Sequence, residues 1–197
     1  MLYLSEREVG WDPELIGFPS IGGCHAIVYV TSNGLFGFHN YGGSANNTWQ
    51  DRAEAFANFV RSHDYNATGI RLYGVAFVLE KRGYSPPQVE NWKGELKTFA
   101  AALGFTGKIR GFDLSSTDIS GSAYVEFRKT NDKCAIFVSP WQTVLSSTGA
   151  NVNGPDHRII VTHGGIHTTV GDQTAQVVDY AQAPTLDRVH TTRLTLM

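Results

Sequence analysis

A cysteine and a histidine flank an apolar hairpin in residues 20–43, and this segment constrains the fold and the chemistry more than any other. Two glycines lead into Cys24, and an apolar, β-branched run follows it. Asn33-Gly34 then supplies turn residues, and a second apolar run ends in His39. Because Val, Ile, Tyr and Phe favour strands and Asn-Gly favours a tight turn, we expect two neighbouring antiparallel strands.

Cys24 and His39 are the candidate catalytic pair. A thiol is a good nucleophile only as the thiolate, and a neighbouring imidazole can accept its proton. In papain-like enzymes the nucleophile opens a helix. Since the residues after Cys24 predict a strand, we do not expect that architecture.

The register of the hairpin decides whether the pair can meet. A two-residue turn at Asn33-Gly34 would leave Cys24 and His39 on one face but about 13 Å apart along the strands. Catalysis requires contact. We therefore predict a longer turn centred near Thr31-Ser32, or a bulge at Gly37.

The length, composition and net charge of the chain limit the class of protein it can belong to. The chain has 197 residues, with 42% hydrophobic and 17% charged residues, as in globular proteins. We expect one domain over residues 1–197. A net charge of −2 argues against nucleic acid as a partner, and no apolar run approaches the length of a membrane span. The start lacks signal-peptide regions, which predicts the cytoplasm, or delivery to a target cell by a signal-peptide-independent route.

The rest of the chain predicts an α+β fold, with a β-sandwich or a central mixed sheet and two flanking helices. Residues 1–19 show no period and predict an irregular lead-in. After Trp141 the composition shifts to Ser, Thr, Gly and Asn, and strands are possible at 158–162 and 175–180. The periodicity predicts helices at 49–62 and 86–103 (the second capped by Ser85), and strands at 70–79, 107–113, 122–129 and 134–139.

The hairpin resembles the signature of glutamine deamidases, the group that includes bacterial chemotaxis receptor deamidases and the catalytic domain of cytotoxic necrotising factor toxins. Their pattern is a Gly-x-Cys or similar, an apolar strand, a short turn and Gly-hydrophobic-x-His. Gly22-Gly23-Cys24, Ala26-Ile27-Val28 and Gly37-Phe38-His39 match it, with 15 residues from the cysteine to the histidine. The order of predicted elements extends the resemblance over about 20–140 and leaves 141–197 as an extension of unassigned role.

The resemblance implies a third group that orients His39. The family uses a threonine six residues before the cysteine, or a main-chain carbonyl. Phe18 occupies that position and offers only its backbone, while Ser20 is the nearest hydroxyl. We expect a main-chain carbonyl within 16–20, with the Ser20 hydroxyl as the alternative. The backbone N–H groups of Cys24 and Gly23, or of a neighbouring loop, would hold the oxyanion, a role worth about 3–4 kcal/mol per donor.

The implied activity is deamidation of a glutamine side chain in a target protein, through a thioester on Cys24 and without a cofactor or metal. An amine in place of water would make the site a transglutaminase. The extension and the divergence from the chemotaxis pattern favour a bacterial effector or toxin. The alternatives are another thiol hydrolase, such as a peptidase or amidase, and a binding module that has lost catalysis.

We expect structural roles for the other candidate residues. Cys134 lies in an apolar strand and predicts a core thiol, and His25 must face away from Cys24's side of the sheet. His163 and His167 are separated by Gly-Gly, which favours a loop over half a metal site. The apolar stripe through Trp92 predicts the core-facing side of a helix.

Overall fold

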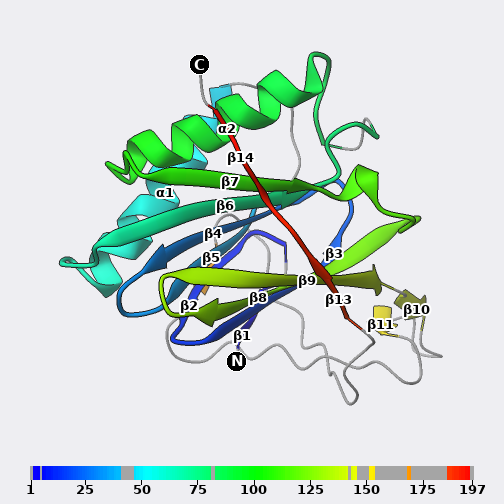
Figure 1. Cartoon of the computed structure of the whole chain (residues 1–197), viewed down its shortest axis with the longest axis horizontal. Coiled ribbons are helices and arrows are strands. Elements are labelled where there is room, and N and C mark those ends of the chain that lie inside the picture. Colours follow the sequence, from blue (N-terminus) through cyan, green and yellow to red (C-terminus); the bar gives the residue numbers. More distant parts are fainter. Residues whose placement is uncertain are drawn as a thin grey trace.

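The protein is built in three layers: two sheets pack face to face, and helices cover the outer face of one of them (Figure 1). The structure is a computed structural model. It describes residues 2–4, 6–40, 47–80, 83–141, 143–145, 151–153, 168–169 and 186–195. Within these residues the fold is α+β, a sandwich of mixed sheets flanked by two helices, as the sequence predicts.

The middle layer is a seven-stranded sheet in the order β12-β2-β5-β4-β6-β7-β14. The predicted hairpin, β4 and β5, lies at its centre, and β6 runs parallel to β7. Every residue of β4 and β5 is buried, because a sheet covers one of their faces and the helices cover the other. The strands are β2 (Glu8–Asp12), β4 (His25–Thr31), β5 (Leu35–Asn40), β6 (Gly69–Ala76), β7 (Lys108–Asp113), β12 (Thr168–Thr169) and β14 (Thr192–Arg193).

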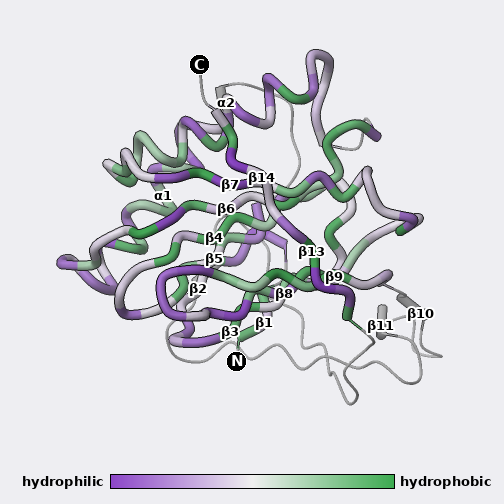
Figure 2. The backbone as a smooth tube through the Cα atoms, viewed as in Figure 1, coloured by the Kyte–Doolittle hydropathy of each residue, from purple (hydrophilic) through white to green (hydrophobic). Residues whose placement is uncertain are grey.

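The outer sheet has five strands in the order β1-β3-β8-β9-β13. A two-stranded sheet, β10 with β11, follows β9 in the chain. Figure 2 shows apolar residues running through the strands of both sheets and hydrophilic residues at the turns between strands. The strands are β1 (Leu2–Tyr3), β3 (Leu15–Ile21), β8 (Ser122–Thr130), β9 (Lys133–Trp141), β10 (Thr143–Leu145), β11 (Asn151–Asn153) and β13 (Asp187–Val189).

Two hydrophobic cores separate the three layers. The inter-sheet core fills the space between the sheets with side chains such as Ile16, Phe18, Val28 and Val75. The helix-side core lies between the seven-stranded sheet and the helices, and includes Phe38, Phe56 and Phe99. Alternate residues of β4 and β5 enter opposite cores, as the period of two in a strand requires.

The helices are α1 (Asn47–His63) and α2 (Gln88–Ala102). Trp92, Leu96, Phe99 and Ala100 of α2 are buried as the apolar stripe predicts, and Gly104 ends the helix with a φ of 63°. The predicted start of α2 is wrong. The helix begins after Pro87, which occupies the cap position and has no polar side-chain atom to form a hydrogen bond. Pro86 stays outside the helix because a residue that precedes a proline is disfavoured in helical conformation. Ser85 therefore does not cap α2.

The prediction of an irregular lead-in at residues 1–19 is also wrong. β2 pairs with β5 in the middle sheet, and β3 pairs with β8 in the outer sheet. Glycine and proline in this segment obscured the alternation. Gly17 is required by packing, since a Cβ there would lie 2.5 Å from the Tyr124 hydroxyl, and Pro19 lies where the β3–β8 register shifts.

The hairpin turn lies one residue earlier than Asn33-Gly34. The Thr31 N–H bonds to the Gly34 carbonyl, so Ser32 and Asn33 form a two-residue turn, and β4 and β5 pair without a bulge at Gly37. The prediction of a longer turn near Thr31-Ser32, or of a bulge at Gly37, is therefore wrong. Gly34 serves packing instead, because a Cβ there would lie 2.7 Å from Trp11 Nε1. As a result Ala26, rather than Val28, pairs with His39.

The end of the described chain forms a strap that joins the two sheets. Residues 186–195 (the strap) pair with β9 through β13 and with β7 through β14, and Figure 1 shows this segment crossing the edge of the sandwich. The possible strands at 158–162 and 175–180, and both His163 and His167, lie outside the described residues. In the part of the chain that the structure describes, neither helix has the length and apolar character needed to cross a membrane.

Trp92 gives a test of the helix-side core. It is 5% exposed and packs against Gly111 on β7, so Trp92→Ala should lower the free energy of unfolding by about 3–5 kcal/mol in a denaturant melt. Tyr65→Ala is the control, because Tyr65 is 85% exposed and should cost less than about 0.5 kcal/mol. A loss under about 1 kcal/mol for Trp92→Ala would contradict the packing of α2 on the sheet.

Candidate functional site

His39 lies on β5 with its side chain in the inter-sheet core. It is 1% exposed, and its Nδ1 lies 2.8 Å from the main-chain oxygen of Leu4. A carbonyl only accepts hydrogen bonds, so Nδ1 carries the proton and donates it. The tautomer is thereby fixed, and Nε2 bears the lone pair. This is the tautomer that a general base acting through Nε2 requires.

Nε2 of His39 makes no hydrogen bond with any residue that the structure describes, although it is buried. The ring instead meets the edge of Phe18, with ring centroids 6.0 Å apart. An unpaired buried nitrogen is costly, and such atoms cluster where chemistry uses them. The environment also makes the imidazole neutral, because burial lowers the pKa of His39 to about 4 even though the Leu4 hydrogen bond opposes that shift.

Cys24 directly precedes β4 and is half-buried against the same inter-sheet core. Because Ala26 pairs with His39, Cys24 is a diagonal neighbour of His39, a relation that typically separates residues by about 7–8 Å. The predicted common face of Cys24 and His39 is therefore present, and the register brings them nearer than a turn at Asn33-Gly34 would. The Cys24 thiol does not hydrogen-bond to His39 Nε2.

The predicted orienting and oxyanion residues lie around this pair. The carbonyl that holds His39 belongs to Leu4, so the expected kind of partner is present but lies outside 16–20. Phe18 contributes its ring rather than its backbone. Ser20 is exposed, with a φ of 60°, and makes no hydrogen bond to His39. Gly23 contacts the loop before α2, since a Cβ on Gly83 would lie 2.5 Å from the Gly23 oxygen.

A buried carboxylate holds the residues that follow the candidate pair. Glu95 on α2 bonds through Oε2 to Nδ1 of His25, at 2.9 Å, and through Oε1 to the side-chain amide of Asn40. His25 follows Cys24, Asn40 follows His39, and the two pair across the strands. One carboxylate therefore fixes the ends of β4 and β5 from the helix side, opposite the inter-sheet core.

Hydrogen-bond donors set the charge of this network. Trp92 Nε1 donates to Nε2 of His25 at 3.1 Å, since indole only donates, and Nδ1 of His25 faces the Glu95 carboxylate. Burial would raise the pKa of Glu95, but bonds from His25 and Tyr84 together with the charge of Arg52, 4.0 Å away, hold it below the usual value. Glu95 is therefore a carboxylate.

Sequence reasoning missed Leu4 and Glu95. Leu4 binds His39 through its main-chain oxygen, and no sequence pattern identifies such a group. Glu95 did leave one: it is a charged residue inside the apolar stripe of α2, next to Leu96, and it is 3% exposed. The assignment of a structural role to His25 agrees with its buried position and its bonds, although its polar partners were not foreseen.

Comparisons with protein-family models and with curated proteins found no match to this chain.

The pKa of His39 predicts a pH dependence of stability. Between pH 4 and 6.5 the unfolded chain binds a proton at this position that the folded protein excludes, so stability falls as the pH drops through this range. From pH 7 to pH 4.5, wild type should lose about 2 kcal/mol of unfolding free energy more than His39→Gln does. The measurement is urea unfolding at both pH values. His190→Gln, which removes an exposed histidine, should behave as wild type, and equal pH dependence of wild type and His39→Gln would show that His39 is not buried as a neutral base.

Proposed function

We propose that the protein is a cysteine-dependent protein glutamine deamidase, with Cys24 as nucleophile and His39 as general base. The observation that carries the proposal is His39 itself: its Nδ1 is bound to a main-chain carbonyl, while Nε2 is buried and unpaired on the face that it shares with Cys24. A purely structural histidine gains nothing from an unpaired Nε2. A base for a neighbouring thiol needs that nitrogen unprotonated.

The Glu95 network supports the proposal from the other face of the sheet. It fixes His25 and Asn40, each covalently joined to a member of the pair, so it holds the backbone positions of Cys24 and His39 relative to each other. Such support is what a site with small tolerances needs. The thiol-to-imidazole bond is not made in the free protein, and catalytic hydrogen bonds of this kind often tighten only when substrate binds.

The reaction starts with transfer of the thiol proton of Cys24 to Nε2 of His39 as sulfur attacks the carbon of the substrate carboxamide. The main-chain N–H groups of Cys24 and Gly23 hold the oxyanion. His39 then returns the proton to the departing nitrogen, ammonia leaves and a thioester remains. Water adds to the thioester with His39 as base, the C–S bond breaks, and glutamate and the free thiol are released. An amine in place of water gives the transglutaminase reaction.

The partner in this proposal is a target protein with an accessible glutamine, and no cofactor is needed. The described elements follow the order hairpin, helix, strand, helix, strands, which also resembles the order in the chemotaxis deamidases. We propose a bacterial effector or toxin that acts in the cytoplasm or is delivered to a target cell. The competing function is a binding module without catalysis, which the near-complete burial of His39 favours.

Thiol labelling tests the pair without knowledge of the substrate. Iodoacetamide at pH 7.5 should label Cys24 well before Cys134, because burial raises the pKa of the Cys134 thiol to about 12. Since this difference alone favours Cys24, the decisive comparison is His39→Gln, which should slow Cys24 labelling about tenfold while leaving Cys134 unchanged. Equal Cys24 rates in wild type and in a folded His39→Gln variant would rule out His39 as the base.

Deamidation itself is tested by peptide mass spectrometry of cytosolic extracts incubated with the protein, as a gain of about one dalton at specific glutamines. Cys24→Ser should abolish the gain, and His39→Gln should reduce its rate by roughly a hundredfold. Ser20→Gly is the matched control, because it removes a nearby hydroxyl and suits the positive φ of that position. A comparable loss in Ser20→Gly would make Ser20 the orienting group, and a gain that persists in Cys24→Ser would refute the mechanism.

A further inference from the structure

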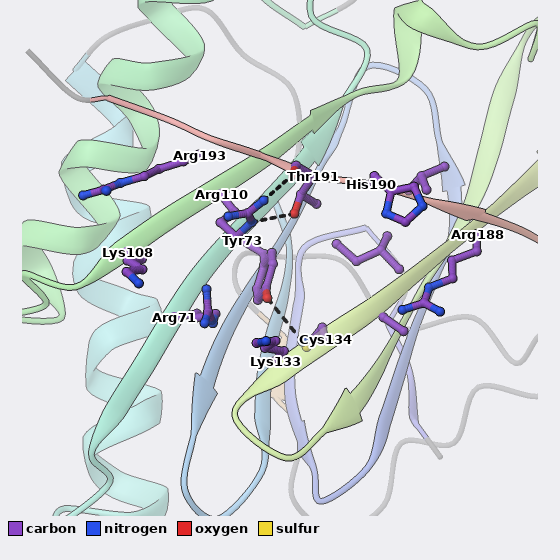
Figure 3. A pocket seen from close by; sticks show the side chains of 13 residues that line it. Arg71, Tyr73, Lys108, Arg110, Lys133, Cys134, Arg188, His190, Thr191 and Arg193 are labelled. Carbon is purple, nitrogen blue, oxygen red and sulfur yellow. Dashed lines mark hydrogen bonds between the residues drawn. The ribbon is translucent and has the colours of Figure 1, made fainter.

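A second cavity lies away from the candidate thiol site, between the strap and the edges of both sheets. It has a volume of about 430 Å³ and is lined by β6, β7, β9 and residues 188–193 of the strap (Figure 3). Arg71 and Tyr73 lie on β6, whose opposite end, Ala76, pairs with His25 beside Cys24. Five residues of strand separate these ends, about 17 Å, so the two sites are distinct.

The lining of this pocket is strongly basic. Six of the chain's 16 Lys and Arg residues line it, and no carboxylate does so among the described residues. Figure 3 shows Arg71, Arg110 and Lys133 gathered around Tyr73, beneath the strap. The six cations are Arg71, Lys108, Arg110, Lys133, Arg188 and Arg193.

Little in the described protein neutralises these charges. Arg71 has one nearby carboxylate, with 3.8 Å between its Nη2 and Asp132 Oδ2. Arg110 anchors the strap, since its guanidinium donates to both the hydroxyl and the carbonyl of Thr191. Lys108 and Lys133, on opposite sheets, form no ion pair with any other residue that the structure describes.

The uncharged lining also suits an anion. The Tyr73 hydroxyl accepts the Cys134 N–H at 3.2 Å, which leaves its own hydrogen to donate into the pocket. Burial raises the pKa of both Tyr73 and Cys134, so neither adds negative charge at neutral pH. A concentration of cations in a concave site creates a local positive potential in a chain whose net charge is −2.

We infer that this pocket binds a small molecule that carries several phosphate groups. Arg71, Lys108 and Arg110 of the middle sheet and Lys133 of the outer sheet line it together, so a compact polyanion can contact several of them at once. The volume suits a small molecule, whereas an extended nucleic acid would need a basic stripe rather than a compact cluster.

The test is calorimetric titration with inositol hexakisphosphate at about 0.15 M salt, a concentration that screens weak surface attraction. We expect one saturable site per chain and a ligand-dependent rise in melting temperature. The variant Lys108→Gln/Lys133→Gln removes one cation from each sheet and should weaken binding roughly a hundredfold. Lys93→Gln/Arg61→Gln makes the same charge change on the helices, outside the pocket, and should bind as wild type.

The results separate the sources of the ligand. Vesicles of phosphatidylcholine with phosphatidylinositol 4,5-bisphosphate, bound with the same sensitivity to Lys108→Gln/Lys133→Gln, would identify a lipid headgroup, while binding of the free probe alone would identify a soluble ligand. Three outcomes would overturn the inference: no binding of either probe, equal weakening in the control variant, or tight binding of a short RNA that inositol hexakisphosphate does not displace. Urea melts show whether each variant is folded, and wild-type titration decides the question if the double variant is not.

Discussion

The Glu95 carboxylate is the interaction on which the rest of the candidate site depends. It is buried and charged, and it connects α2 to the adjacent ends of β4 and β5 through His25 and Asn40. Burying a charge without partners would cost several kcal/mol. The donors from His25, Tyr84 and Asn40, with Arg52 nearby, offset that cost only if the helix and both strands lie in this one arrangement.

The opposite face of the same strands is fixed by main-chain geometry. Leu4 follows β1 in the outer sheet, and its carbonyl orients the imidazole of His39 on the middle sheet. The candidate pair therefore lies between a carboxylate network on one side and an inter-sheet hydrogen bond on the other. A site that is held from both faces keeps its geometry, which the proposed mechanism would require.

The strap lies at the other end of the sandwich, where it borders the basic pocket. It pairs with β9 and β7, so it connects the sheets at an edge where their side chains would otherwise meet water. Arg110 bonds the strap to the middle sheet, and the cations around it have few carboxylates to offset them. The basic pocket and the candidate thiol site therefore lie toward opposite ends of β6.

Much of the fold was determined by the sequence alone, because periodicity and turn residues act locally. The helices, the four strands from 70 to 139, the common face of Cys24 and His39 and the opposite direction of His25 all follow from it. Strands β2 and β3 were missed because Gly and Pro interrupt their pattern.

Only the tertiary structure decided how those elements combine. The register of the hairpin depends on the bond from Thr31 to Gly34 and on the packing of Gly34 against Trp11, neither of which a two-residue turn rule contains. The Leu4 carbonyl is a main-chain group, which every residue has, so the sequence does not identify it as the partner of His39. The basic pocket collects cations from segments more than a hundred residues apart, and only the pairing of strands between distant segments could bring them together.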